Sequence, residues 1–271
     1  MNNFFTRALT GALFVIVLLG SITLSKYTFS ILFLIIAILG IGEFYKVSEK
    51  NDTLKLHKTI GTLTAILIFS GCALASWLGD FRIVIINIPI LFSIFIVELY
   101  SKSLNPFSNI AYTMLGILYV AIPLSLLNFI VFYNSFYHPN ILIGFLLILW
   151  ASDTGAYLVG SLIGKTKLFE RISPKKTWEG SLGGALCSLL VAYFISNYFT
   201  DLRLIDWIII AMILIIIGTL GDLVQSLYKR SYNIKDSGNI LPGHGGILDR
   251  FDSLLLSTPF VFTYLYFIQH S

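Results

Sequence analysis

The stretch IDWIIIAMILIIIGTLGDLV, residues 205–224, decides the fold class of this chain. As an α-helix it is about 30 Å long, which matches the thickness of the hydrocarbon core of a bilayer. Its side chains are apolar on nearly every face, as expected of a helix surrounded by lipid or by other membrane helices. We therefore predict a transmembrane helix that carries a carboxylate, Asp222, near its end.

Eight further apolar stretches of similar length follow one another along the chain, each bounded by charged residues, Asn, Pro or Gly. They cover residues 8–24, 29–45, 60–79, 83–99, 110–132, 140–160, 180–199 and 252–269. The sequence thus predicts an all-α, polytopic membrane bundle of about nine transmembrane helices. Because Asn87 and Pro89 interrupt the fourth stretch, a count of eight stays open.

The composition agrees with a membrane protein. Hydrophobic residues make up 56% of the 271 positions and charged residues 12%, against about 25% charged residues in soluble domains. We predict one membrane domain over residues 1–271, with N-terminal helices in 1–139 and the helices and loops that carry the chemistry in 140–271. The net charge of +4 is too small to indicate nucleic acid as a partner. Cys72 and Cys187 stand alone in apolar runs, which suits neither a disulfide framework nor a zinc site.

The basic residues are unevenly distributed over the predicted loops. Fifteen of the eighteen Lys and Arg residues fall at the N-terminus or in the second, fourth, sixth and eighth loops. Cytoplasmic loops of membrane proteins are enriched in these residues. We therefore predict a multi-pass protein of the cell membrane with a cytosolic N-terminus and an outer C-terminus. Three strongly basic loops, 46–59, 161–179 and 225–251, then face the cytosol together.

The densest polar stretch is GDLVQSLYKRSYNIKDSGNILPGHGGILDRFDS, residues 221–253. Asp222, Ser226 and Lys229 are spaced by four and three residues, so a continuing helix presents them on one face. Several glycines then let the loop fold back, so that Asp249 can converge with Asp222 on one divalent cation. Carboxylates together with phosphate oxygens are the usual ligands of Mg²⁺ in phosphoryl and nucleotidyl transfer.

A set of salt bridges between these acids and the neighbouring Lys and Arg side chains is the alternative that the spacing leaves open. His244 lies between glycines in the run PGHGG. A flexible backbone of this kind can approach an anion closely. For His244 we predict a phosphate contact or a role in positioning the loop.

The second polar stretch is ASDTGAYLVGSLIGKTKLFERISPKKTWEG, residues 151–180. Lys175 and Lys176 place two ammonium groups directly before the next predicted helix, whose N-terminus favours anions. The stretch therefore predicts a cradle for a triphosphate. It is not a Walker loop, because the glycine spacing before the lysine differs.

Three further acids lie near the predicted cytosolic ends of helices. Asp153 is either a buried ion-pair partner or a member of the site. Glu43 and Glu98 are close enough to the helix ends to reach the membrane interface, so we assign them no role in the site.

Taken together, these motifs resemble the phosphatidate cytidylyltransferases, also called CDP-diacylglycerol synthases. The family pattern is Ser, two residues, Lys-Arg, four residues, Lys-Asp, a Gly-containing stretch to His-Gly-Gly, and Asp-Arg-x-Asp. This chain carries it as Ser226, Lys229, Arg230, Lys235, Asp236, Gly238, His244, Gly245, Gly246, Asp249, Arg250 and Asp252. The segment SPKKTWEG, residues 173–180, and the Asp153–Gly155 segment resemble two earlier family motifs, so the likeness covers roughly residues 150–255.

The resemblance implies that the phosphate of phosphatidic acid attacks the α-phosphorus of CTP, giving CDP-diacylglycerol and pyrophosphate. The attacking group is already an anion, so catalysis consists mainly of positioning and charge neutralisation. The cofactor implied is Mg²⁺ held by Asp222 and Asp249, with a second cation left open, and the partners are CTP, the membrane lipid and a second copy in a homodimer. The other implied catalytic residues are Lys229, Arg230 and His244, and the implied substrate-binding residues are Lys175, Lys176, Ser226, Lys235, Asp153 and Arg250.

Three residues depart from the family pattern without removing a proposed metal ligand: Gln225 stands where Glu is common, Ser161 where Arg is common, and Tyr228 where an apolar residue is usual. One alternative function is an ion-coupled transporter, whose polar residues should lie near the bilayer midplane. Another is a related enzyme that acts on a different lipid phosphate or on a polyprenol.

Overall fold

The computed structural model describes residues 3–240 and 245–270, without the side chains of residues 3–8. Two antiparallel hairpins, each of two short strands, are its only sheet structure within these ranges. The helices are α1 (Asn3–Leu24), α2 (Lys26–Ser48), α3 (Lys58–Leu78), α4 (Arg82–Ile85), α5 (Asn87–Leu99), α6 (Pro106–Gly116), α7 (Ile122–Val131), α8 (Pro139–Ile163), α9 (Trp178–Ser196), α10 (Leu204–Ile213), α11 (Thr219–Ser231) and α12 (Leu248–His270). The remaining elements are the π-helical turns η1 (Ile117–Ala121) and η2 (Leu214–Gly218) and the strands β1 (Phe132–Tyr133), β2 (Phe136–Tyr137), β3 (Lys167–Phe169) and β4 (Ser173–Thr177).

The prediction of an all-α, polytopic membrane bundle is confirmed. Over the described ranges, eight helical spans of 18 to 28 residues are long and apolar enough to cross a membrane, and Leu9–Leu24 forms a shorter apolar helix. Each of the nine predicted stretches therefore coincides with helical structure, to within a few residues at its ends. The interruption expected in the fourth stretch falls at Ile86, between α4 and α5.

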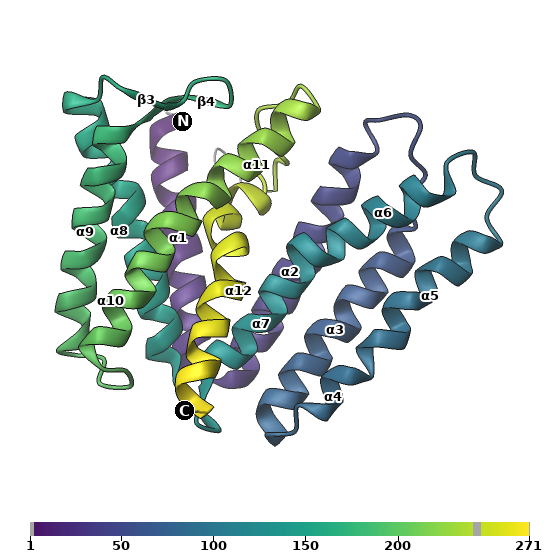
Figure 1. The fold of residues 1–271 in the computed structure, drawn as a ribbon, viewed down its shortest axis with the longest axis horizontal. Helices are drawn as coiled ribbons and strands as arrows, with labels where there is room; N and C mark the ends of the chain where they lie inside the picture. Colours follow the sequence, from purple (N-terminus) through teal and green to yellow (C-terminus); the bar gives the residue numbers. More distant parts are fainter. Residues whose placement is uncertain (1–2, 241–244, 271) are drawn as a thin grey trace.

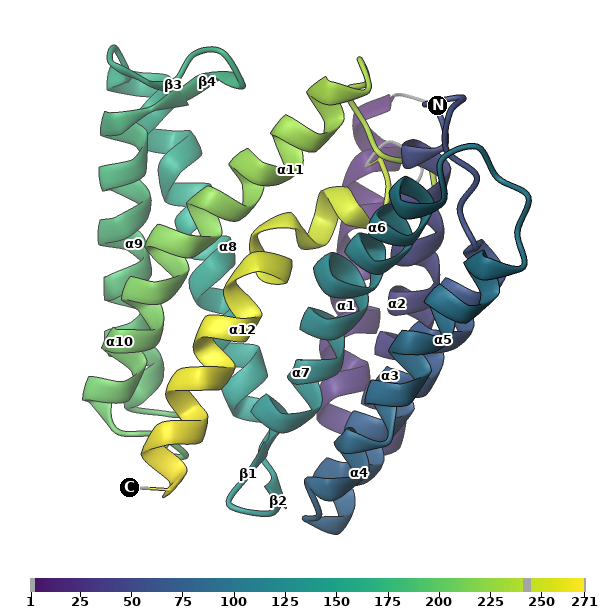
Figure 2. The same ribbon diagram turned by 45° about the vertical axis from the view of Figure 1, so that its right-hand side comes forward.

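The helices run between two ends of the molecule, as Figures 1 and 2 show. The N-terminus, the β3–β4 hairpin and the C-terminal end of α11 lie at one end, together with the connection from α2 to α3. The C-terminus and α4 lie at the other end. The three basic loops predicted to share one side of the membrane thus share one end of the bundle.

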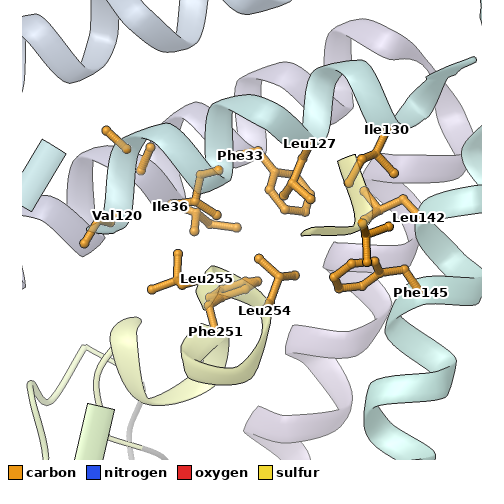
Figure 3. Packing of buried hydrophobic residues seen from close by; sticks show 14 of the residues in the cluster. Phe33, Ile36, Val120, Leu127, Ile130, Leu142, Phe145, Phe251, Leu254 and Leu255 are labelled. Carbon is orange, nitrogen blue, oxygen red and sulfur yellow. The ribbon is translucent and has the colours of Figure 1, made fainter. Parts of the chain in front are cut away.

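The apolar core fixes α12 among helices from the first half of the chain. Figure 3 shows Phe251 and Leu254 of α12 facing Phe33 of α2, Leu127 of α7 and Phe145 of α8. All five side chains are buried, and the rings of Phe33 and Phe251 meet edge to face with centroids 6.3 Å apart. The packing of this core therefore restrains the first two turns of α12, which carry Phe251 and Leu254.

Helices α8 and α9 approach each other closely through small residues. A Cβ atom on Gly155 would lie 2.7 Å from the Cys187 sulfur and 2.9 Å from the Gly183 carbonyl oxygen, so only glycine fits there. Small residues are the usual means by which membrane helices come close together. The close approach brings Asp153 on α8 to the same end of the bundle as the start of α9. Both cysteines are free, as predicted.

Candidate active site

A cavity of about 680 Å³ opens between α1, α8, the β4–α9 junction, η2, α11 and α12. Its size lies within the ordinary range for small-molecule sites. Its lining contains both charged and apolar side chains. The charged lining residues are Asp153, Lys175, Lys176, Asp222, Asp249, Arg250 and Asp252. The apolar lining includes Phe14, Val15, Leu149, Trp150 and Leu214.

Helix α11 brings Asp222 to this cavity, and the helix follows directly on the π-helical turn η2. A Cβ atom on Gly221 would lie 2.8 Å from the carbonyl oxygen of Asp252, so the glycine lets α11 and α12 touch. One Asp222 oxygen pairs with the Lys176 ammonium at 2.5 Å, and the other accepts a hydrogen bond from the Ser226 hydroxyl at 3.3 Å. The predicted helical face of Asp222 and Ser226 is therefore present.

Asp249 in the first turn of α12 accepts three hydrogen bonds. The Lys229 ammonium donates to one carboxylate oxygen at 2.7 Å, and the backbone N–H groups of Ser237 and Gly246 donate to the other at 2.9 and 3.0 Å. Only 6% of the Asp249 side chain is exposed. Charge-assisted bonds of this kind are about twice as strong as neutral ones, so Asp249 ties the end of α11 and the following loop to α12.

Both carboxylates that the sequence assigns to a metal therefore hold a lysine in this structure. Of the salt bridges expected with Lys229, Arg230 and Arg250, the one between Lys229 and Asp249 is present. Asp222 pairs instead with Lys176, a partner that the sequence did not indicate. Arg250 also lines the cavity, and no salt bridge joins it to an acid within the described residues. The lining residue Asp222 thus keeps the positive charge of Lys176 at the cavity.

The cavity also suits an oxygen-bound cation. Besides the two paired acids it contains Asp153, whose side chain is exposed to the cavity, and Asp252, which accepts a hydrogen bond from the Ser253 backbone N–H at 2.7 Å. Among the described residues no three His, Cys, Asp or Glu side chains form a metal cluster. Mg²⁺, however, commonly takes one or two carboxylates and completes its shell with water and substrate phosphates. The carboxylates that line the cavity fit this mode of Mg²⁺ coordination.

The start of α9 forms the basic edge of the cavity. The Thr177 hydroxyl caps the helix by accepting a hydrogen bond from the Gly180 N–H at 3.2 Å. Glu179 accepts backbone N–H bonds from Lys165 at 3.2 Å and Thr166 at 3.1 Å, which secures the β3–β4 hairpin to the helix. The hairpin itself was not predicted. It presents Lys176 beside a helix N-terminus, the arrangement expected of an anion site.

Five predicted site residues are not among the described residues that line the cavity. Ser226 and Lys229 contact the lining carboxylates Asp222 and Asp249, and the other three are Arg230, Lys235 and His244. Arg230 donates to the Ile234 carbonyl oxygen at 3.3 Å, and neither it nor the exposed Lys235 lines the cavity. His244 lies outside the described residues. The roles assigned to these three residues remain predictions.

Two acids differ from the sequence interpretation. Glu43 was expected to reach the membrane interface, but it is only 5% exposed and accepts hydrogen bonds from the Ile247 and Leu248 N–H groups. Asp252 was given no role, yet it lines the cavity. A carboxylate inside an apolar stretch is by itself a signal of function, and that signal could have identified both.

Comparison with known proteins decides the family. The profile of the Cytidylyltransferase family matches residues 5–268. A phosphatidate cytidylyltransferase from Staphylococcus haemolyticus is 35% identical over 260 residues, which cover 93% of this chain and 95% of the relative. The chain belongs to the cytidylyltransferase family. Among other members, a phosphatidate cytidylyltransferase from Staphylococcus saprophyticus is 35% identical over 93% of this chain and 95% of its own length. One from Staphylococcus aureus is 45% identical over 59% of this chain and 60% of its own length.

In this cytidylyltransferase family member, the Lys229–Asp249 pair should be a measurable source of stability. Replacing Lys229 by Met leaves a nearly buried carboxylate without its cation, which costs about 3 kcal/mol or more. We expect a lower thermal unfolding temperature in detergent for Lys229→Met, and a partial recovery in the Lys229→Met/Asp249→Asn double variant. Lys235→Met, at an exposed position, is the control. Equal unfolding temperatures for Lys229→Met and the wild-type chain would contradict the pairing.

Proposed function

We propose that this chain is a CTP:phosphatidate cytidylyltransferase that forms CDP-diacylglycerol and pyrophosphate from CTP and phosphatidic acid. One observation carries the proposal. A single cavity among membrane helices is lined both by lysines and carboxylates and by apolar side chains. A polar nucleotide and a lipid phosphate can meet only in a site of this mixed character. The relatives named phosphatidate cytidylyltransferase support the same reaction.

The bond changes require little acid–base chemistry. An anionic oxygen of the lipid phosphate attacks the α-phosphorus of CTP, a new P–O bond forms, and the bond to pyrophosphate breaks. Lys175 and Lys176, beside the N-terminus of α9, attract the triphosphate and neutralise the charge that develops on its oxygens. Holding the two phosphates in line supplies the remainder of the rate enhancement.

Lys176 has a second part in this mechanism. In the structure its ammonium group neutralises Asp222, and both side chains line the cavity. Phosphate oxygens compete for the same ammonium group when the substrates enter. Lys176 therefore stays at the cavity before the anions arrive and binds them without a large rearrangement. Lys229 does not line the cavity; it acts on Asp249, which does.

Asp222 and Asp249 are the residues that would hold Mg²⁺, with Asp252 and Asp153 close by in the same cavity. Bound there, the cation would neutralise charge on the substrate phosphates. The acids would also keep the site from accumulating uncompensated positive charge, since four carboxylates line the cavity together with Lys175, Lys176 and Arg250.

The apolar residues that line the cavity suit the acyl chains of the lipid. The same cavity that holds the charged residues is also lined by Phe14 and Val15 of α1, Leu149 of α8 and Leu214 of η2. A phosphatidic acid molecule can enter between helices, with its phosphate at the charged residues and its acyl chains among these side chains.

We also infer that the charged end of the bundle faces the cytosol and that the protein resides in the cell membrane. The uneven distribution of Lys and Arg supports this orientation. CTP and pyrophosphate are cytosolic solutes, so the same orientation gives them access to the site.

Thiol labelling in intact cells tests this orientation. In a background lacking Cys72 and Cys187, we expect a membrane-impermeant maleimide to label Ser135→Cys, in the exposed turn of the β1–β2 hairpin, from outside. Asp52→Cys, in the connection between α2 and α3, should react only after the cells are permeabilised. The reverse pattern would contradict the orientation.

Turnover by the purified chain tests the reaction. With CTP, phosphatidic acid and Mg²⁺ in detergent, we expect CDP-diacylglycerol and pyrophosphate in equal amounts, and no product without the lipid or with EDTA. Mass spectrometry of the lipid and a pyrophosphate assay measure both products. A monodisperse sample that fails with phosphatidic acid but reacts with another lipid phosphate would overturn the substrate and keep the chemistry.

Two carboxylate variants test the roles assigned in the cavity. Asp222→Asn and Asp249→Asn should each lower turnover at least about a hundredfold, because each removes charge from the site that positions the phosphates. Asp52→Asn, on an exposed loop at the same end, is the matched control and should keep wild-type activity. Near-normal turnover by either cavity variant, in protein that elutes as a folded species, would remove that residue from the mechanism.

A further inference from the structure

Glu43 of α2 caps the N-terminus of α12 from another part of the chain. Its two carboxylate oxygens accept hydrogen bonds from the backbone N–H groups of Ile247 and Leu248, each at 3.0 Å. Glu43 is 5% exposed and lies near the C-terminal end of α2. The first N–H groups of a helix have no partner within the helix and carry partial positive charge. The buried Glu43 carboxylate supplies acceptors for these N–H groups and a negative charge that balances their partial positive charge.

The loop that precedes α12 is packed directly onto the same carboxylate. A Cβ atom on Gly238 would lie 2.3 Å from one Glu43 oxygen, and one on Gly246 would lie 2.4 Å from the other. At these distances a Cβ atom at either position would displace the Glu43 carboxylate. Glu43 thus fixes the path of the loop between α11 and α12 at two points, Gly238 and Gly246.

The same turn of α2 also contacts α11. The rings of Phe44 and Tyr228 stack in parallel with centroids 4.9 Å apart. The Tyr228 hydroxyl donates to the Phe44 carbonyl oxygen at 2.8 Å and lies 2.9 Å from the Ser48 hydroxyl. One turn of α2 therefore contacts both helices that carry the proposed metal ligands.

We propose that Glu43 is a positioning residue for the transfer reaction, acting through the first turn of α12. Asp249 is the next residue after the two whose N–H groups Glu43 binds, and it accepts its own N–H bonds from Ser237 and Gly246 in the same loop. Displacement of this turn moves Asp249 relative to Asp222, and errors of about 1 Å in a site of this kind cost about a hundredfold in rate. This inference rests on the proposed function.

Glu98 of α5 provides a matched comparison. It is likewise buried, with 2% exposure, and likewise accepts several hydrogen bonds, here from His57, Ser103 and Asn109. None of these residues lines the cavity. A variant at Glu98 therefore measures what the loss of a buried carboxylate does when the cap on α12 is intact.

The first experiment compares Glu43→Gln with Glu98→Gln. The Gln amide nitrogen would face one of the two N–H donors, so the cap loses an acceptor as well as its charge. We expect Glu43→Gln to lower kcat about tenfold to a hundredfold while the KM for CTP changes less than about threefold. Glu98→Gln should keep the wild-type kcat per folded molecule even if its unfolding temperature falls. Glu43→Asp should recover part of the lost kcat, since it retains the charge at the helix end.

Amide hydrogen exchange gives a readout that does not depend on turnover. Exchange at Ile247 and Leu248 should be at least about tenfold faster in Glu43→Gln than in the wild-type chain, and unchanged in Glu98→Gln. If Glu43→Gln does not fold, Gly238→Ala displaces the Glu43 carboxylate without removing it and should show the same kinetic and exchange changes. A folded Glu43 variant with wild-type kcat, or with wild-type exchange at these two amides, would overturn the proposal. If the wild-type chain lacks CTP turnover, the proposed function fails. The exchange comparison alone then tests whether Glu43 caps α12.

Discussion

Carboxylates can lie among membrane helices only where cations or N–H groups meet them, and this constraint organises one end of the bundle. Asp249 accepts three hydrogen bonds, Glu43 two, and Asp222 pairs with a lysine. Apolar contacts alone give membrane helices little preference for one partner, because lipid tails are equally apolar. The charged contacts therefore determine how the ends of α2, α9, α11 and α12 meet.

The same contacts prepare the cavity for anions. Two anionic substrates require positive charge in place before they arrive, yet an unpaired ammonium group in a poorly hydrated site is costly. Asp222 resolves this by holding Lys176 at the cavity, and Asp249, which also lines the cavity, binds Lys229. Exchange of a carboxylate for a phosphate oxygen then replaces one charge-assisted bond by another, so binding requires little reorganisation of the protein.

The sequence predicts those features that local geometry determines. Long apolar runs predicted a helix at each of nine positions, and the four-residue spacing of Asp222 and Ser226 predicted their shared face. The pairing of Lys176 with Asp222 depends on how α9 packs near α11, which no local spacing encodes. The cap by Glu43 joins residues 204 positions apart. The β3–β4 hairpin escaped prediction because its strands, Lys167–Phe169 and Ser173–Thr177, are too short to show an alternating pattern.

Helix α12 connects the stability of the bundle to the geometry of the site. Phe251 and Leu254 pack into the core against α2, α7 and α8, while Asp249, less than one turn away from Phe251, lies in the cavity. Close-packed cores resist small displacements, so the core restrains the first two turns of α12 at Phe251 and Leu254, and Glu43 restrains the N–H groups at the start of the helix. Rotation or sliding of α12 would break either the apolar contacts of the core or the two hydrogen bonds to Glu43. The position of Asp249 therefore follows from apolar packing and from a buried carboxylate acting together, and neither alone accounts for it.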